Sequence, residues 1–371
     1  MARALVIVES VAKATRIQSM LGSDYIVRAS VGHVRDLPQS AAEIPAAVKG
    51  EKWARLGINV DDHFKPVYVV SSDRRKVVSE LKSALKQVDE LYLATDEDRE
   101  GEAIAWHLEE LLNPRVPVKR MVFHEITPAA IERAVHETRD LDTRLVDAQE
   151  GRRFLDRLVG YEVSPVLWRA VDKARSAGRV QSVAIRLVCE RERERMAFRS
   201  ATWFDVTATL DAGTDFDATV ETLDGAPLAS GRNFDATGRL DPAVTVQVLS
   251  ESAARDLAGA LETATVTVAT VTSTPRTQRP QPPFMTSSLQ IEASRKLRFD
   301  PERTMRAAQR LYEQGWITYM RTDSTTLSDE ALRAARSMAA AMFGDDYVTD
   351  APRRYDRKVK NAQEAHEAIR P

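Results

Sequence analysis

Cysteine is nearly absent from this chain of 371 residues, since Cys189 is the only one. A disulfide within the chain is therefore excluded, and so is a zinc site made of several cysteines. No apolar run approaches the roughly 20 residues that a membrane-spanning helix needs. The opening residues MARALVIVES lack the layout of a secretion signal. We therefore expect a soluble cytoplasmic protein without a membrane partner.

An excess of positive charge is missing too, because 53 lysines and arginines face 55 aspartates and glutamates. The net charge of −2 does not by itself indicate a nucleic-acid-binding protein. The distribution is uneven: carboxylates gather in TDEDREGE (95–102), and basic residues are dense from Arg152 to Arg199. An acidic metal site beside a basic groove would have this pattern, and so would solvated helices with ion pairs.

Residues 1–140 alternate apolar segments with amphipathic ones, which predicts a βα-repeating domain with a mostly parallel sheet. We expect strands at 5–9, 25–30, 66–72, 90–96 and 118–123. We expect helices at 12–21, 76–88 and 101–112, and another that starts after Thr127. Ligands of such sheets bind at the carboxyl ends of the strands, where Glu9 and Asp96 fall.

The remaining residues change pattern twice. From 142 to 198 the periodicity is helical, with a loop expected around SPVLW (164–168) and DKARSA (172–177). Alternation of apolar and polar residues then predicts antiparallel strands at 203–210, 215–228 and 263–273. After the proline-rich stretch 274–284, we expect a winged-helix-like unit with helices at 286–297, 301–314 and 328–343 and a short strand at 315–320.

Three acids alternate at the end of the predicted strand 90–96: Asp96, Asp98 and Glu100. In an extended turn their side chains can point to one side, and carboxylate oxygens are the ligands that Mg²⁺ prefers. One or two acids here could instead complement the dipole of the following helix. Three acids, with Glu9 on another strand end, favour the metal site.

Basic and aromatic residues complete the candidate site. Lys13, one turn into a helix, could hold a phosphate, although a solvated surface lysine is the alternative. His33 lies in the polar loop GHVRDLP (32–38), which argues against a core histidine. Tyr319 and Arg321 share one face of the predicted strand, so the arginine could stabilise a phenolate nucleophile. Packing remains the commoner role of a strand tyrosine.

The chain resembles bacterial DNA topoisomerase I, the type IA topoisomerases, over essentially its whole length, and within them an actinobacterial type. The matching motifs, in the family's order, include ALVIVES (4–10), SVGHVRDLP (30–38), LATDEDREGEAIAWHL (93–108), FHEIT (123–127), RRFLDRLVGYEVSP (152–165), SAGRVQSVA (176–184), PPFMTSSLQ (282–290), ITYMRTDST (317–325) and NAQEAHEAIRP (361–371). The resemblance implies a multidomain α/β protein: a Toprim domain (1–140), a helical strand-binding segment (141–200), a β-rich arch segment (201–275) and a winged-helix-like domain (276–371) with the catalytic tyrosine.

The resemblance also implies an activity: transient cleavage of one DNA strand, strand passage and religation, which relaxes negatively supercoiled DNA without ATP. Tyr319 would become joined to the 5′ phosphate, and Glu9 would protonate the leaving 3′ oxygen. Lys13 and Arg321 would stabilise the phosphoryl oxygens. Mg²⁺, held by Glu9, Asp96, Asp98 and Glu100, would align the ends for rejoining.

The DNA-binding positions implied by the resemblance contact phosphates more than base edges. They are His33, Arg153, Asp156, Arg157, Trp168, Ser176, Ala177, Gly178, Arg179, Val180, Gln181, Ser182, Arg321, Asp323 and His366. Trp168 could stack on a base or be buried in the core. We expect a monomer that acts on single-stranded DNA in the nucleoid.

The family core continues beyond the equivalent of Pro371, so we expect this chain to bind single-stranded DNA and at most to cleave it. Two alternatives remain. One is a Toprim nuclease or primase-like enzyme that works without the tyrosine, and the other is a DNA-binding protein without catalysis.

Overall fold

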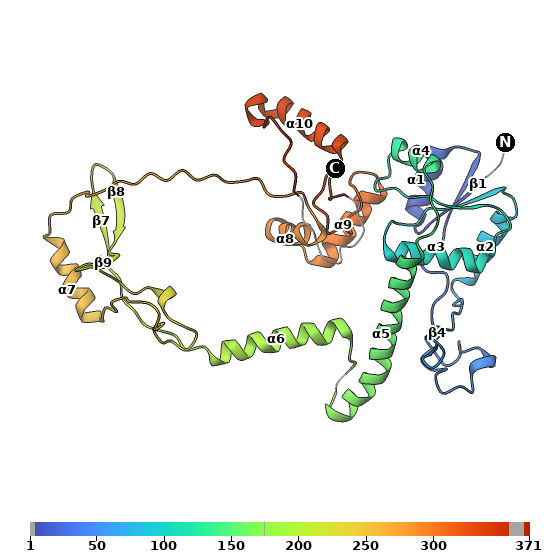
Figure 1. The fold of residues 1–371 in the computed structure, drawn as a ribbon, viewed down its shortest axis with the longest axis horizontal. Helices are drawn as coiled ribbons and strands as arrows, with labels where there is room; N and C mark the ends of the chain where they lie inside the picture. Colours follow the sequence, from blue (N-terminus) through green and yellow to red (C-terminus); the bar gives the residue numbers. More distant parts are fainter. Residues whose placement is uncertain (1–3, 174, 356–366) are drawn as a thin grey trace. The chain divides into compact units, whose positions relative to one another are not determined.

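The structure is a computed structural model, and it describes residues 4–173, 175–355 and 367–371. The chain forms two compact units. The first unit combines Met1–Ala170 with Arg279–Pro371, and the second is Val171–Gln278. Figure 1 gives the course of the chain and the element labels. None of the helices in the described ranges is both long and apolar enough to cross a membrane.

A four-stranded parallel sheet is the centre of the first unit, as predicted. Its order is β2 (Tyr25–Ala29), β1 (Ala4–Val8), β5 (Glu90–Leu93) and β6 (Val118–Arg120). Strand β1 is buried along its whole length because its apolar run is covered on both faces. The connecting helices are α1 (Val11–Leu21), α2 (Arg75–Leu85), α3 (Arg99–Leu112) and α4 (Pro128–His136). Helix α4 is capped by Thr127, as expected.

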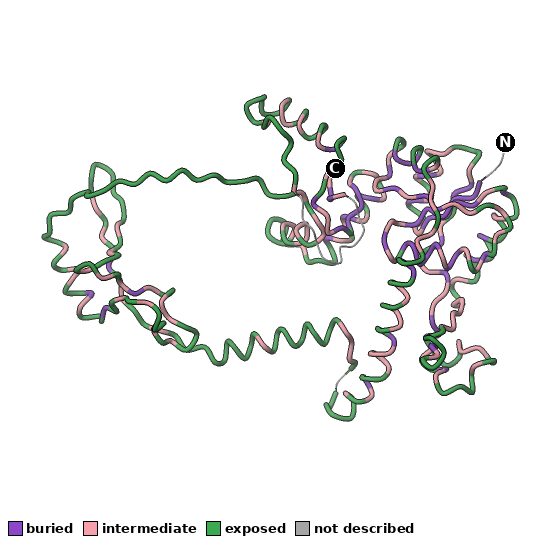
Figure 2. Tube along the Cα trace, viewed as in Figure 1, coloured by how far each residue is buried: buried purple, intermediate pink, exposed green. Residues whose placement is uncertain are grey.

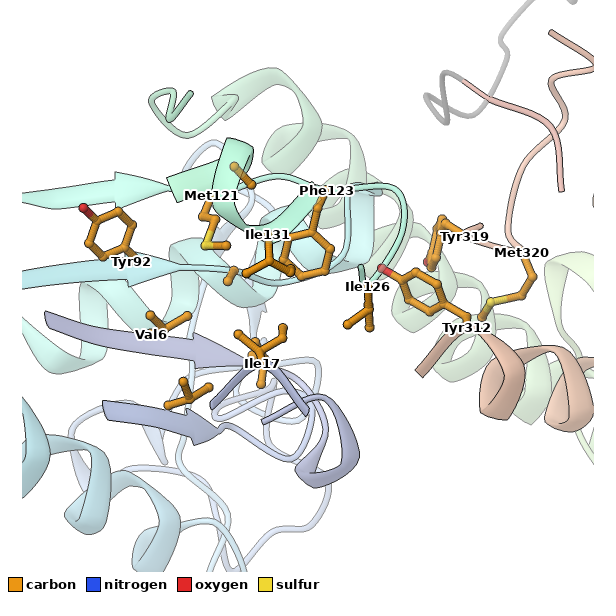
Figure 3. Packing of buried hydrophobic residues seen from close by; sticks show 14 of the residues in the cluster. Val6, Ile17, Tyr92, Met121, Phe123, Ile126, Ile131, Tyr312, Tyr319 and Met320 are labelled. Carbon is orange, nitrogen blue, oxygen red and sulfur yellow. The ribbon is translucent and has the colours of Figure 1, made fainter. Parts of the chain in front are cut away.

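The two faces of the sheet belong to two cores. One core packs Leu5, Ile7 and Leu91 against α2 and α3. The other begins with Val6 and Ile17 and continues into the C-terminal part of the unit, where it includes Tyr312, Tyr319 and Met320 (Figure 3). Figure 2 shows the buried residues concentrated on the sheet and its helices. The C-terminal segment is therefore packed directly against the Toprim-like sheet.

The predicted strand at 66–72 is wrong for most of its length. A two-residue strand β4 (Lys65–Pro66) pairs with β3 (Ile58–Asn59), and beyond it only Val69 bridges to Asp36. Residues 67–70 are only half-buried. Their apolar side chains therefore reflect partial packing against the loop at 30–38 and not a place in the four-stranded sheet.

Helix α5 (Thr143–Ala170) is longer than predicted and contains Pro165. The segment SPVLW thus lies in the helix, and the next helix along the chain is α6 (Arg179–Ala197). Proline has no amide hydrogen to donate to the carbonyl of Tyr161, so the helix loses one hydrogen bond here.

The second unit has little core. Strands β7 (Thr207–Asp211) and β8 (Asp215–Thr219) pair antiparallel, as do β9 (Thr222–Leu223) and β10 (Ala226–Pro227). The predicted strand at 263–273 is wrong: these residues are irregular, and Val268 and Val271 are 77% and 84% exposed. Alternation without a pairing partner does not make a strand. Helix α7 (Glu251–Glu262) was not predicted, although Ser250 caps it.

The C-terminal part of the first unit has the three helices that were predicted: α8 (Thr286–Leu297), α9 (Pro301–Glu313) and α10 (Asp329–Phe343). The predicted strand at 315–320 is wrong, because this segment bonds to loops instead of to a neighbouring strand. The amide of Tyr319 donates to the carbonyl of His124 (2.8 Å), and that of Thr318 donates to Arg370 (2.8 Å). The winged-helix likeness and the four domain boundaries remain predictions.

Candidate active site

Glu9, Lys13 and Asp96 meet at the carboxyl ends of β1 and β5. Glu9 Oε1 accepts the backbone amide of Asp96 (2.5 Å), and Lys13 Nζ donates to Glu9 Oε2 (3.0 Å) and to Asp96 Oδ1. Lys13 is 1% exposed, so the surface-lysine alternative is wrong. Burial lowers the pKa of Lys13, but Asp96 and Glu9 raise it more, to above its ordinary value. Lys13 is thus a fixed ammonium at the strand ends.

Asp98 and Glu100 belong to the start of helix α3 and not to an extended turn. Asp98 is the N-cap, where its Oδ1 accepts the amide of Gly101 (2.7 Å). Its Oδ2 accepts the hydroxyl of Tyr319 (2.5 Å). Glu100 accepts Arg321 Nη1 (3.0 Å). The helix-cap alternative therefore holds for Asp98, and Asp96, Asp98 and Glu100 nevertheless all line one cavity.

The acids offer the kind of donor that Mg²⁺ prefers, but in this state other side chains occupy two of them. Within the described ranges, no three histidine, cysteine or acidic side chains are gathered as a metal site would require. Asp98 and Glu100 offer the oxygen donors that Mg²⁺ prefers, but Tyr319 and Arg321 occupy them. A metal ion at these residues would have to displace those partners.

Tyr319 is buried (4% exposed), and its hydroxyl bonds to the acid loop, the segment 96–100 that carries Asp96, Asp98 and Glu100. Burial, together with Asp96 and Asp98, raises the pKa of the phenol far above its ordinary value, and Arg321 lowers it only slightly. The expected stabilisation of a phenolate by Arg321 is therefore present but outweighed by burial and the two carboxylates. Tyr319 is held as a neutral phenol that donates to a carboxylate.

Tyr312 was missed by the sequence analysis. From α9 its hydroxyl donates to Asp96 Oδ1 (3.1 Å), and its ring lies edge-on to that of Tyr319, with 5.2 Å between centroids (Figure 3). Lys13 Nζ lies 4.9 Å from the centre of the Tyr312 ring. The sequence signals only that Tyr312 lies on the buried face of α9, with Thr304 and Ala308 at spacings of four.

Arg120 holds the backbone from which the acid loop begins. The sequence analysis did not predict this residue either. It forms a fully buried ion pair with Glu102 (2.9 Å). Its Nη1 donates to the carbonyls of Leu93 (3.0 Å) and Thr95 (2.8 Å), and its Nη2 to that of Asp96 (2.8 Å). These bonds fix the course of the chain where β5 ends.

Gly101 permits the tight turn between Asp96 and helix α3, because a Cβ at this position would lie 2.1 Å from the Asp96 carbonyl oxygen. We expect Gly101→Ala to lower the free energy of unfolding by about 1–3 kcal/mol through overpacking. It should also reduce any reaction that depends on Asp96. Urea unfolding checks the first effect. Gly151→Ala is the matched control, since no atom lies within 4 Å of its added Cβ. Equal stability of Gly101→Ala and the parent chain would refute this account of the turn.

A cavity of about 850 Å³ opens beside these residues. On one side it is lined by Glu9, Lys13, Asp96, Asp98 and Glu100, and on the other by side chains of α9. Arg321 also lines it. The cavity is large enough for part of a nucleic-acid strand and leads to the acid loop.

Predicted DNA-binding residues of the first unit form an ion-paired network. Arg153 pairs with Asp36 (2.5 Å), and Arg157 is buried and donates to the carbonyl of Pro38 (2.9 Å). His33 Nε2 lies 3.9 Å from Glu100 Oε1, so it does border the acid loop. The neighbouring Arg35 Nε donates to His107 Nδ1 (2.7 Å). In this state Arg157 supports the loop at 30–38.

The other predicted DNA-binding residues differ in their exposure. Trp168 is 51% exposed, so the buried-core alternative is wrong. Asp156 is exposed on α5, and Asp323 is half-buried after Arg321. Residues 176–182 belong to the second unit, at the start of α6, where Gln181 Nε2 donates to the Ser176 carbonyl (3.1 Å). His366 lies outside the described residues. The DNA-binding roles of all these residues stay predictions.

A parallel sheet with an acidic loop at its carboxyl edge is what the Toprim resemblance implies, and the comparisons agree. The Toprim domain family matches residues 4–126, and the DNA topoisomerase family matches residues 140–371. DNA topoisomerase 1 of Mycolicibacterium smegmatis is 61% identical over 377 residues, which cover 100% of this chain and 40% of that protein. DNA topoisomerase 1 of Streptomyces coelicolor is 58% identical, with 100% and 39% covered.

A solved structure is similar as well. Full-length topoisomerase I from Thermotoga maritima has a TM-score of 0.73 and 36% identity, and the match covers 99% of this chain and 55% of that one. The chain belongs to the bacterial DNA topoisomerase I family, the type IA topoisomerases. It spans about 40% of the length of the curated relatives that it matches.

Proposed function

We propose that this chain carries the cleavage centre of a type IA DNA topoisomerase. Tyr319 attacks a phosphodiester of single-stranded DNA, forms a 5′-phosphotyrosine link and releases a 3′ hydroxyl. Attack by that hydroxyl reverses the step, and passage of another strand in between relaxes negatively supercoiled DNA without ATP. The observation that supports the proposal is the hydrogen bond between Tyr319 and Asp98. It places a nucleophile from the C-terminal part of the chain beside carboxylates from the N-terminal part.

Acids beside the tyrosine accept the proton that the phenol loses and supply the proton that the leaving oxygen gains. As the phenol oxygen bonds to phosphorus, its proton passes to Asp98, which already accepts that hydrogen bond. The bond from phosphorus to the 3′ oxygen breaks, and Glu9 gives that oxygen a proton. Burial and the Glu9 carboxylate raise the pKa of Asp96 above its usual range, so this pair can hold the proton that is needed. Lys13 and Arg321 stabilise the phosphoryl oxygens.

Mg²⁺ is the proposed cofactor, and when bound it would supply positive charge that aligns the DNA ends. Asp98 and Glu100 would hold it, with Glu9 and Asp96 beside them. We expect Asp98→Asn with Glu100→Gln to weaken Mg²⁺ binding roughly tenfold or more in calorimetry, since both charged donors are lost.

Arg321→Gln tests the same metal site, and here we expect the Mg²⁺ affinity to rise. Because Arg321 occupies Glu100, its removal should tighten Mg²⁺ binding. Unchanged affinity in both variants would place the metal elsewhere and leave the acids as a helix cap.

Formation of a covalent adduct tests the proposed function. The chain is incubated with a labelled single-stranded oligonucleotide and Mg²⁺, and the products are separated on a denaturing gel. We expect a labelled band at the mass of the protein when the label is on the 3′ side of the cut, and none when it is on the 5′ side. Binding without any adduct would favour the alternative of DNA binding without catalysis.

A further inference from the structure

Helix α9 presents a row of arginines to the cavity beside the acid loop. Arg303, Arg306 and Arg310 all line this cavity. Their spacing of three and four residues puts them on one face of the helix. The cleavage mechanism above uses none of them.

These arginines are available for an anionic ligand. Within the ranges that the structure describes, the side chains of Arg303 and Arg310 make no ion pair, and Arg306 only approaches Glu302 at 3.8 Å on the exposed surface. The Arg303 guanidinium lies 3.9 Å from the centre of the Phe299 ring, which holds it in place. The same cavity is lined by Lys13 and Arg321, which the mechanism assigns to the scissile phosphate, so the α9 arginines can extend that positive charge to neighbouring phosphates.

We propose that Arg303, Arg306 and Arg310 bind backbone phosphates of the DNA segment that becomes joined to Tyr319. This inference rests on the proposed function. Guanidinium groups bind phosphates with paired hydrogen bonds. Seven residues of helix rise span about 10 Å, so the row can contact more than one phosphate of a single strand. The row therefore matches a short stretch of one strand.

The packing of α9 against Tyr319 indicates on which side of the cleaved bond the arginines bind DNA. Tyr312, on α9, packs against Tyr319, whereas Glu9 and Lys13 belong to the sheet and its first helix. After cleavage the 5′-phosphate fragment stays on Tyr319, and the 3′-hydroxyl end stays near Glu9. The arginines of α9 accordingly hold the covalent fragment, which lies on the 3′ side of the cut.

The test measures binding in a Tyr319→Phe background, where no cleavage complicates it. Fluorescence anisotropy follows a single-stranded oligonucleotide across a range of salt concentrations. Changing the three α9 arginines to glutamine should lower the salt slope by about 2, from about 0.7 per lost phosphate contact, and weaken binding on the order of tenfold or more. Arginine-to-lysine changes at the same positions keep the charge and should retain most of the affinity.

The matched control removes the same charge away from the cavity. This control combines Arg295→Gln, Lys296→Gln and Arg333→Gln. The three residues lie on α8 and α10, and their side chains are exposed and do not line the cavity. We expect binding by this control to match the parent. Equal losses in both triple variants would reduce the effect to general electrostatics and overturn the inference.

Trimmed oligonucleotides then assign the side, once the wild-type adduct has mapped the cut. The loss from the α9 variant should persist when nucleotides remain on the 3′ side and vanish when the strand ends at the cut. A loss that depends only on 5′ nucleotides would overturn the assignment. An adduct with unchanged binding by the α9 variant overturns this inference alone, whereas absence of any adduct overturns the proposed function and this inference with it.

Discussion

Tyr319→Phe will form no covalent DNA adduct and will still bind single-stranded DNA. The change removes only the hydroxyl, which donates to Asp98, and keeps the buried ring that packs against Tyr312. Without the phenol oxygen no bond to phosphorus can form, so the adduct should fall below detection. The measurement is the denaturing gel with a 3′-labelled oligonucleotide, alongside anisotropy for binding.

Tyr312→Phe is the matched control for this experiment. Tyr312 is also a buried phenol that donates to an acid of the same loop, Asp96. We expect its variant to keep the adduct, at a reduced rate because Asp96 loses a hydrogen bond. An adduct of undiminished yield from Tyr319→Phe, or loss of the adduct only in Tyr312→Phe, would remove Tyr319 from its proposed role.

Arg120→Met will destabilise the first unit by about 3–5 kcal/mol, because breaking a buried ion pair leaves its partner charge without compensation. The partner is Glu102, whose side chain is fully buried and keeps only Arg139 as a cation. Three carbonyls at the end of β5 also lose their donor. Urea unfolding at neutral pH measures the loss, and adduct formation should fall with it because Asp96 is no longer held.

The loss should shrink at mildly acidic pH. Burial raises the pKa of Glu102, but Arg139 and Arg120 lower it more, to below its ordinary value of 4.5. The parent chain therefore gains stability from Glu102 above that value and loses it as the pH falls through the lower pKa of the folded state. In Arg120→Met, Glu102 takes up a proton more readily, so the two chains converge in acid.

Lys119→Gln is the control for Arg120. Lys119 precedes Arg120 on β6 and pairs with Glu90 at the surface (2.9 Å). We expect a change below about 1 kcal/mol, as for other exposed pairs. If Arg120→Met and Lys119→Gln unfolded at the same urea concentration, the buried network would not support the acid loop as described.

Much of the site was predictable from the sequence, because local patterns place residues at strand ends. The apolar runs before Glu9 and Asp96 specify buried parallel strands, and parallel strands bring their carboxyl ends to one edge. Both acids do meet there, with Lys13 between them. The resemblance to the family added Tyr319 and Arg321, which no local pattern distinguishes from packing residues.

Only the tertiary structure decided the partners across long sequence separations. Three of these contacts join segments that meet only after the chain folds. Tyr319 donates to Asp98, Tyr312 donates to Asp96, and Arg120 donates to the end of β5. The failed strands at 66–72, 263–273 and 315–320 have the same cause. An apolar or alternating pattern indicates which side chains prefer burial, but a strand also needs a neighbour with free backbone groups. In the described structure these segments meet loops or solvent instead.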